Sequence, residues 1–206
     1  MSIFKRRRFP VEIILLCVRW YCKYGISYRD LAEMMQERGV EVDPSTIFRW
    51  VQRYAPELEK RVRRYQGHRP GSWRVDETYV RVGGRWKYLF RAVDKHGQLI
   101  DFMLSDRRNT KAAYRFLRKA LRTMSDYPPS SITTAKLASY PKAIRRLRRE
   151  GHLAHSFEYR TSKYLNNIIE ADHGALKRVI RPTRGFQRMK TAYATIKGFE
   201  VMRMIR

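Results

Sequence analysis

The spacing of hydrophobic residues changes near Ser72, and this change limits the folds that the sequence can adopt. Before it, apolar residues recur every three or four positions, which is typical of amphipathic helices. After it, alternating β-branched and aromatic residues predict strands, and Gly83-Gly84 predicts a hairpin turn. We therefore expect a helical domain over residues 1–58, a basic linker over 59–71, and an α/β domain with a closing helix over 72–206.

Two short helices with capping signals are expected in the second half of the helical domain. Ser27 can cap a helix over Tyr28–Arg38, and Asp43-Pro44 can begin another over Ser45–Tyr54. We expect Trp50 in the core rather than stacked on a nucleic-acid base. Two helices joined by a glycine-containing turn form a helix-turn-helix candidate, and an ordinary helical bundle is the alternative. The polar face expected to contact DNA comprises Ser45, Thr46, Arg49 and Arg53.

The charge of the chain favours the DNA-binding interpretation. The sequence has 45 Lys and Arg against 19 Asp and Glu, a net charge of +26. Solubility alone needs a net charge of only about 2–8, so this excess predicts a polyanionic partner. Nucleic acid is the first candidate and an anionic membrane surface the second. Hydrophobic residues at 43% are typical of a folded chain and not of a disordered basic tail. In the linker we expect phosphate contacts, or else a solvated connector, from Lys60, Arg61, Arg63 and Arg64.

Several classes of protein are excluded by the same sequence. No apolar stretch approaches the roughly 20 residues of a membrane span, and the basic N-terminus lacks a small-residue cleavage site. The two cysteines, Cys17 and Cys22, make neither a disulfide scaffold nor a zinc cluster. His152 and His155 have no third ligand near them, so we expect them on the surface of a strand. These features favour a cytoplasmic protein.

The elements after Ser72 are expected in the order β-β-β-α-β-α-β-α. This order predicts a mixed sheet flanked by helices, the α/β arrangement of the ribonuclease-H-like fold. Its fourth strand is expected at Ser131–Thr134 and its fifth at His152–Tyr159. The closing helix, Met189–Ile205, is expected to cover the sheet rather than to mediate dimerisation.

Acidic residues are scarce, so their positions are informative. Asp76 lies in the middle of a strand, where a buried carboxylate is costly unless it is paired or bound to a metal. Glu77 is next to it but should point to the opposite face. Glu170 lies early on a helix. Asp76 and Glu170 together suggest half of a divalent metal site for phosphoryl transfer, and unrelated surface or salt-bridged acids are the alternative.

Four strings in the sequence carry a resemblance to a known family: SYRDLAEMM (27–35), STIFRWV (45–51), WRVDETY (73–79) and LNNIIE (165–170). The chain resembles DDE-class transposases of bacterial insertion sequences, nearest to family six, whose members form cointegrates. The resemblance implies a helix-turn-helix that binds terminal inverted repeats, and a ribonuclease-H-like integrase-type core. It also implies Mg²⁺ as cofactor, with Mn²⁺ as a substitute, and three catalytic acids. The implied partners are double-stranded DNA, both transposon ends and target, and further copies of the chain in a homodimer or higher oligomer.

Carried onto this sequence, the resemblance makes Asp76 the first acid and Glu170 the third. The second acid should follow the short strand, where the sequence reads ITTAKL (132–137) and Ala135 holds the expected position. Thirty-four residues separate Ala135 from Glu170, the spacing that the family shows. A methyl group cannot bind Mg²⁺, so we expect weakened metal binding and an inactive or severely impaired enzyme, whether the change is engineered or natural. Contacts with the transposon end are expected from Lys177, Arg178 and Arg181.

The expected function is therefore that of a transposase. Its family nicks the 3′ ends of the transposon with Mg²⁺ and then transfers the strand into target DNA. The alternative is a non-catalytic, sequence-specific DNA-binding protein, such as a repressor of its own element. A ribonuclease or resolvase of the same fold is a third interpretation, against which the helix-turn-helix and the 34-residue spacing argue. The expected location is the bacterial cytoplasm, in association with the nucleoid.

Overall fold

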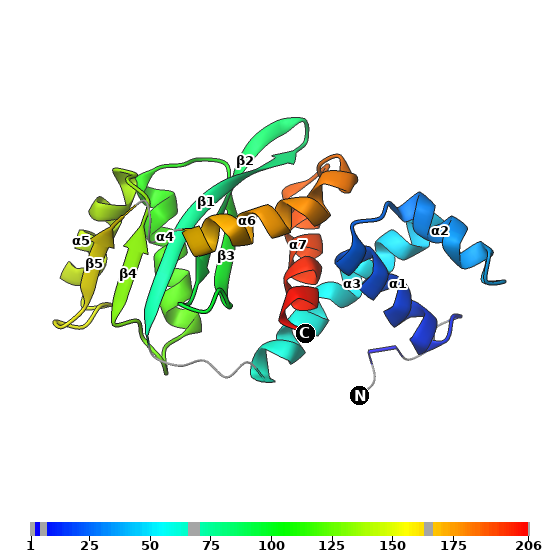
Figure 1. Cartoon of the computed structure of the whole chain (residues 1–206), viewed down its shortest axis with the longest axis horizontal. Helices are drawn as coiled ribbons and strands as arrows, with labels where there is room; N and C mark the ends of the chain where they lie inside the picture. The colour runs from blue at the N-terminus through cyan, green and yellow to red at the C-terminus, as the bar shows by residue number, and fades with distance from the viewer. Residues whose placement is uncertain (1–2, 5–7, 66–70, 163–166, 206) are drawn as a thin grey trace. The chain divides into compact units, whose positions relative to one another are not determined.

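A computed structural model gives the structure of residues 3–4, 8–65, 71–162 and 167–205, without the side chain of Arg64. The chain divides into two compact units, each described here by itself. The helical unit comprises Met1–Gln66 and Leu176–Arg206, and the α/β unit comprises Gly67–Ala175. Figure 1 shows the order of their elements. Among the described residues, no helix combines the length and the apolar character that crossing a membrane requires.

The helical unit begins with three helices whose ends follow from local chemistry. Gly25 ends the first helix in the left-handed conformation, with φ of 63°. The hydroxyl of Ser27 accepts a hydrogen bond from the backbone N–H of Asp30, which closes a capping box. Asp43 caps the third helix by accepting from the N–H of Ser45 at 2.7 Å. The caps at Ser27 and Asp43 were predicted and are confirmed. The three helices are α1 (Val11–Tyr24), α2 (Tyr28–Gln36) and α3 (Pro44–Val62).

Helix α3 is longer than predicted. It continues past Tyr54 and through Pro56 to Val62, and a 3₁₀ turn, η1 (Arg63–Tyr65), follows it. Proline removes a backbone donor and usually breaks a helix, but here the flanking Tyr54 and Ala55 are fully packed. The start of the predicted linker is therefore helical, and residues 66–70 of that linker lie outside the described residues.

The closing helix, α7 (Met189–Met204), packs against α1 and α3 in the helical unit. The expectation that it covers the sheet is wrong. The fit depends on Gly198, where an added Cβ would lie 2.5 Å from the Sγ of Cys22. Polar contacts complete it: Gln52 Nε2 donates to Thr195 Oγ1 at 2.8 Å. A long-range fit of this kind leaves no trace in the periodicity of the helix itself.

The α/β unit is built on a five-stranded sheet in the order β3-β2-β1-β4-β5 (Figure 1). β1 pairs antiparallel with β2, which pairs antiparallel with β3, whereas β4 and β5 run parallel to β1. This mixed sheet flanked by helices confirms the predicted ribonuclease-H-like fold class. Its elements are β1 (Ser72–Val82), β2 (Arg85–Val93), β3 (Leu99–Ser105), α4 (Thr110–Thr123), β4 (Ser131–Thr134), α5 (Ser139–Arg149) and β5 (Glu158–Thr161).

The core of the α/β unit lies between one face of the sheet and helices α4 and α5. Trp73 and Val75 of β1 belong to it, packed with Phe116 of α4 and Leu147 of α5. Side chains alternate between faces along a strand, so Asp76 must point to the other face. That face is the one approached by α6 (Asn167–Ile180), which continues from the α/β unit into the helical unit.

Strand β5 is shorter and later than predicted. Gly151, with φ of 74°, ends α5, and a turn-rich segment follows before Glu158. His152 and His155 therefore lie in this segment and not on a strand, and that expectation is wrong. Only Glu158–Thr161 pairs with β4, in register with Ser131–Thr134.

Candidate functional site

Asp76 is the central acid of the face opposite α4 and α5. Its side chain is only 16% exposed, and its Oδ2 lies 3.8 Å from the Nδ1 of His173 on α6. Burial, together with the adjacent carboxylate of Glu77 and the charge of Glu170, raises the pKa of Asp76 from its ordinary 3.8 to about 7. An acid in this state gains most from a nearby cation, which would stabilise its charged form.

Helix α6 is fixed to this face by a buried ion pair. Arg91 of β2 lies directly opposite Asp76 in the β1–β2 register and is fully buried. Its guanidinium donates to Oδ2 of Asp172, whose side chain is 8% exposed. Glu170 and His173 lie on either side of Asp172 on the same helix. The ion pair of Arg91 with Asp172 therefore fixes how far these two residues lie from the sheet. Glu170 itself is exposed, and its charge contributes to the raised pKa of Asp76.

Ala135 directly follows Thr134, the last residue of β4 that pairs with β1. The parallel register ends at Val75 with Thr134, so the next residues in line are Asp76 and Ala135. Residues paired in parallel strands project to the same face, so continuing this register by one residue would put the Cβ of Ala135 on the face of Asp76. An aspartate at position 135 would therefore add a carboxylate beside that of Asp76.

The side chains present do not fit a two-ion magnesium centre. Mg²⁺ requires near-octahedral oxygen coordination, and Asp76 and Glu170 offer carboxylates while Ala135 offers no donor. Over residues 8–65, 71–162 and 167–205, no three His, Cys, Asp or Glu side chains are grouped so that they could hold a metal ion. His173, which sequence reasoning missed, lies beside Asp76, with 3.8 Å between its Nδ1 and the Oδ2 of that acid. Its one signal in the sequence is its place one helical turn after Glu170.

Glu77 has a different role from its neighbour. Its side chain is 4% exposed and points into the α4–α5 face, as predicted. The hydroxyl of Tyr140 donates to Glu77 Oε2 at 2.6 Å, and Nε of Arg108 lies 2.7 Å from Glu77 Oε1. Burial and the charge of Glu77 hold the pKa of Tyr140 well above its ordinary value. Glu77 is thus a paired acid of the core.

The start of α3 carries the predicted polar face of the helical unit. Ser45, Arg49 and Arg53 are exposed, and Trp50 is buried in the core as predicted. Arg49 is held along the helix by hydrogen bonds from its guanidinium to the carbonyl and the hydroxyl of Ser45, at 3.2 and 2.9 Å. Thr46 is half-buried.

The basic residues after this face are partly engaged within their own helix. Arg61 pairs with Glu57 at 3.0 Å, and Arg63 pairs with the buried Glu59 at 2.8 Å. Lys60 is exposed. Of the predicted linker cations, Lys60 and Arg61 therefore present the most accessible charge among the described side chains.

A hollow of about 860 Å³ lies beside the start of α3 in the helical unit. Ser27 and Arg29 at the start of α2, Ser45 and Phe48 of α3, and Arg184 line it. Arg184 follows the 3₁₀ turn η3 (Arg181–Thr183), and among the described residues it is the only non-glycine with positive φ, at 53°. That conformation costs a side-chain-bearing residue roughly 1 kcal/mol, so the surrounding structure holds it.

Sequence analysis predicted DNA contacts from Lys177, Arg178 and Arg181, which precede Arg184 in the chain, but it missed Arg184 itself. The three predicted residues are exposed and belong to the helical unit. The available signal for Arg184 was the turn-forming glycine that follows it. Its presence beside α3 depends on tertiary structure, which no local pattern encodes.

Comparison with known proteins shows which family the chain belongs to. A family model described as a DDE domain matches residues 71–206. The chain is 38% identical over 207 residues to the transposase for insertion sequence-like element IS431mec of Staphylococcus aureus (strain N315), covering 97% of this chain and 87% of that protein. It is 37% identical, with the same coverage, to the transposase for insertion sequence element IS257 in transposon Tn4003 of Staphylococcus aureus.

Solved structures also include similar chains. One is the HTLV-2 integrase catalytic core domain in complex with magnesium (trimeric form), at 13% identity and a TM-score of 0.48, covering 65% of this chain and 86% of that chain. Another is the simian T-cell lymphotropic virus intasome in complex with PP2A regulatory subunit B56 gamma, at 16% identity and a TM-score of 0.46, covering 63% of this chain and 49% of that chain.

Proposed function

The chain belongs to the DDE-domain transposases of insertion sequences, and from this premise we propose that its helical unit binds the terminal inverted repeats of its element. The exposed start of α3 supports this role. Hydrogen bonds to Ser45 fix the guanidinium of Arg49 at the start of α3. A recognition helix typically contacts base edges with residues of its first turns. Arg184 lines the hollow beside Ser45 and adds a cation there. The basic residues after α3 and at the end of α6 would position the duplex through its phosphates.

We further propose that Asp76 and Glu170 are two of the three catalytic acids, and that Ala135 stands where the third belongs. The observation that supports this proposal is the β1–β4 register, which ends at Val75 with Thr134, one residue before Asp76 and Ala135. The raised pKa of Asp76 supports it, because the ordinary occupant of such a site is a divalent cation. The finer assignment is to family six, with Mg²⁺- or Mn²⁺-dependent 3′ nicking and strand transfer in a dimer or higher oligomer.

For the chain as it stands we infer no catalytic step, because its donor set does not fit two ions. It would bind transposon ends without cutting them. That behaviour also satisfies the second candidate function, a non-catalytic DNA-binding protein that represses its own element. The absence of a three-ligand group from the described residues favours this second function for the present sequence, although not for its family.

The experiment that separates the two functions restores the missing acid. We expect the unaltered chain to bind an inverted-repeat duplex and to show no nicking with Mg²⁺ or Mn²⁺. We expect Ala135→Asp to nick and join the same duplex with either metal, a gain of several orders of magnitude because both ions can then be held. Gel analysis of labelled strands measures both products.

Matched variants make this test specific. Ala135→Asn has nearly the size of aspartate without its charge, and it should stay inactive. Adding Asp76→Asn or Glu170→Gln to Ala135→Asp should abolish the products again. If Ala135→Asp folds and binds the ends but shows no metal-dependent cleavage, the assignment of the three acids is wrong. Cleavage by the unaltered chain would refute the role of position 135.

A further inference from the structure

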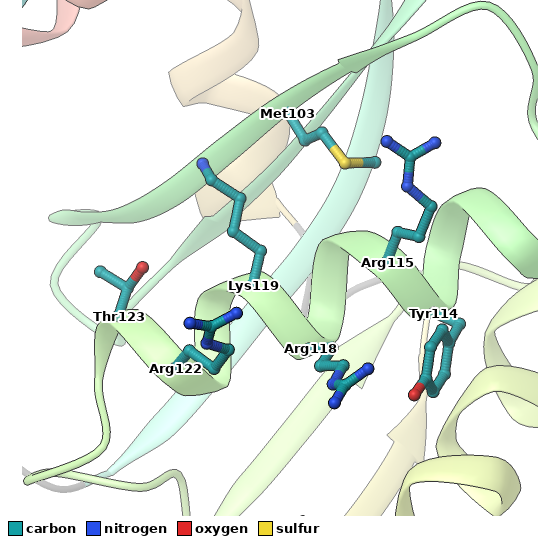
Figure 2. A pocket seen from close by; sticks show the side chains of 7 residues that line it. All are labelled: Met103, Tyr114, Arg115, Arg118, Lys119, Arg122 and Thr123. Carbon is teal, nitrogen blue, oxygen red and sulfur yellow. The ribbon is translucent and has the colours of Figure 1, made fainter.

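A second basic surface lies on α4, away from the residues discussed so far. Here a hollow of about 620 Å³ is lined by Met103 of β3 and by six residues of α4 (Figure 2). In Figure 2 the side chains of Arg115 and Lys119 extend from α4 toward Met103. None of the described residues that line the hollow has a carboxylate. Its four cations are Arg115, Arg118, Lys119 and Arg122.

Three of these cations form one stripe on the helix. Arg115, Arg118 and Arg122 are spaced by three and four residues, so they are neighbours on the helix surface, and all three are exposed. The opposite side of α4 is anchored in the core by Phe116 and Leu117, which are fully buried. The packing of the core therefore fixes which way the arginine stripe faces.

The acids nearest to the hollow are already engaged by other groups. On the β3 side, Asp101 accepts from Nζ of Lys119 at 2.6 Å and from Oγ1 of Thr123 at 2.9 Å. On the α5 side, Glu150 accepts from the hydroxyl of Tyr114 at 2.5 Å and pairs with Arg146 at 2.8 Å. Within the described residues, no acid is therefore paired with the three arginines of the stripe.

The hollow lies on the opposite side of the sheet from Asp76. Met103 is opposite Phe90 in the β2–β3 register, and Phe90 is opposite Glu77 in the β1–β2 register. These three residues share a face, and Asp76 projects from the other one. The arginine stripe therefore cannot bind the stretch of DNA that is presented to Asp76.

We propose that the arginine stripe of α4 binds the phosphate backbone of duplex DNA, at a stretch other than the one presented to Asp76 and without reading its sequence. This inference rests on the proposed function, because it assumes that the chain acts on DNA. The stripe covers about 10 Å of helix, and each strand of a duplex carries a phosphate about every 3.4 Å along the axis, so three arginines match about three phosphates. Guanidinium groups suit phosphate oxygens because they donate in pairs.

The test compares two triple variants with the same loss of charge. The first is Arg115→Ala, Arg118→Ala and Arg122→Ala on α4. The control is Lys142→Ala, Arg145→Ala and Arg149→Ala, three exposed residues of α5 that no described acid pairs with. Fluorescence anisotropy measures the affinity for a random-sequence duplex across a series of salt concentrations, and the affinity for an inverted-repeat duplex in parallel.

We expect the α4 variant to lower the slope of log K against log salt by about 2–3, at about 0.9 per lost phosphate contact, and the α5 control to lower it by less than about 1. The α4 variant should still prefer the inverted repeat, because that reading belongs to the helical unit. A third variant with lysine at all three α4 positions keeps the charge and should keep the slope.

Equal slopes in the α4 variant and the α5 control would overturn the inference, since net charge alone would then explain the loss. Loss of the slope in the lysine variant would also overturn it, because backbone binding through charge tolerates lysine. If the unaltered chain binds no duplex at all, the proposed function fails and the inference fails with it. If the unaltered chain binds the inverted repeat and only the slopes are equal, the proposed function stands alone.

Discussion

Asp76 and Glu77 are adjacent on β1, but the two faces of the sheet give them opposite surroundings. Glu77 points into the core, where Tyr140 donates to it and Arg108 pairs with it. Asp76 points toward α6, and burial there raises its pKa to about 7. On one face of the sheet, polar groups stabilise the fold, whereas the other face keeps a carboxylate in a state that favours an added cation.

The cation opposite Asp76 in the β1–β2 register does not remove this difference. Arg91 is directly opposite Asp76 on β2, but its guanidinium donates to Asp172 of α6. The pair is buried, and breaking a buried pair is costly because it leaves one charge without compensation. Arg91 therefore serves to attach α6, while Asp76 remains the acid on which a bound metal would act.

The largest effect that tests this comparison is expected from Glu77. Replacing Glu77 with Ala leaves the buried Tyr140 hydroxyl without its acceptor and Arg108 without its partner. We expect a loss of about 3 kcal/mol in the free energy of unfolding, measured by urea denaturation. Glu77→Gln keeps an acceptor for Tyr140 and should lose less. If Glu77→Ala unfolds at the same urea concentration as the unaltered chain, the acid does not have the structural role assigned to it.

A smaller effect of opposite sign is expected from Asp76. Its pKa is higher in the folded chain than the ordinary 3.8, so the folded state binds the proton more tightly. The stability cost of its charge is absent below about pH 4 and complete above about pH 7. Asp76→Asn should therefore match the unaltered chain at pH 4 and exceed it by on the order of 2 kcal/mol at pH 8 without divalent metal.

The pH dependence of that difference is the informative measurement. The groups around Asp76 are Glu77 and Arg91 on the sheet, Glu170 and His173 on α6, and Arg108, and most of their effects cancel between the two proteins. Glu170→Gln removes one of the charges that raise the pKa of Asp76, so it should show a weaker version of the same trend. A stability difference that stays constant from pH 4 to pH 8 would contradict the raised pKa.

What the sequence predicted well was governed by neighbouring residues. The caps at Ser27 and Asp43 depend on groups two or three positions away in the sequence. The opposite orientations of Asp76 and Glu77 follow from the alternation of a strand. The order of elements then restricted the sheet to few topologies, and the observed strand order agrees with the predicted fold class.

What the sequence did not predict depends on contacts between distant residues. Helix α7 packs on α1 and α3 because a glycine, Gly198, admits the side chain of Cys22, and the amphipathic pattern of α7 does not say which surface it meets. His173 comes near Asp76 only because the buried pair of Arg91 with Asp172 sets the position of α6. Arg184 comes beside Ser45 through a similar long-range arrangement.

The smallest effect concerns Ala135 and tests whether it lies on the face of Asp76. Ala135→Asp would add a second negative charge beside Asp76, so we expect it to lower the free energy of unfolding by about 1 kcal/mol at pH 8 without divalent metal. At pH 4, where Asp76 is protonated, the loss should largely vanish. Mg²⁺ should reverse the loss, because a ligand that binds only the folded state stabilises it. Ala135→Asn adds the same bulk without the charge and should respond neither to pH nor to Mg²⁺. If thermal or urea denaturation shows the two variants responding alike, position 135 does not adjoin the carboxylate of Asp76, and the distinction drawn between the two faces of β1 does not extend to β4.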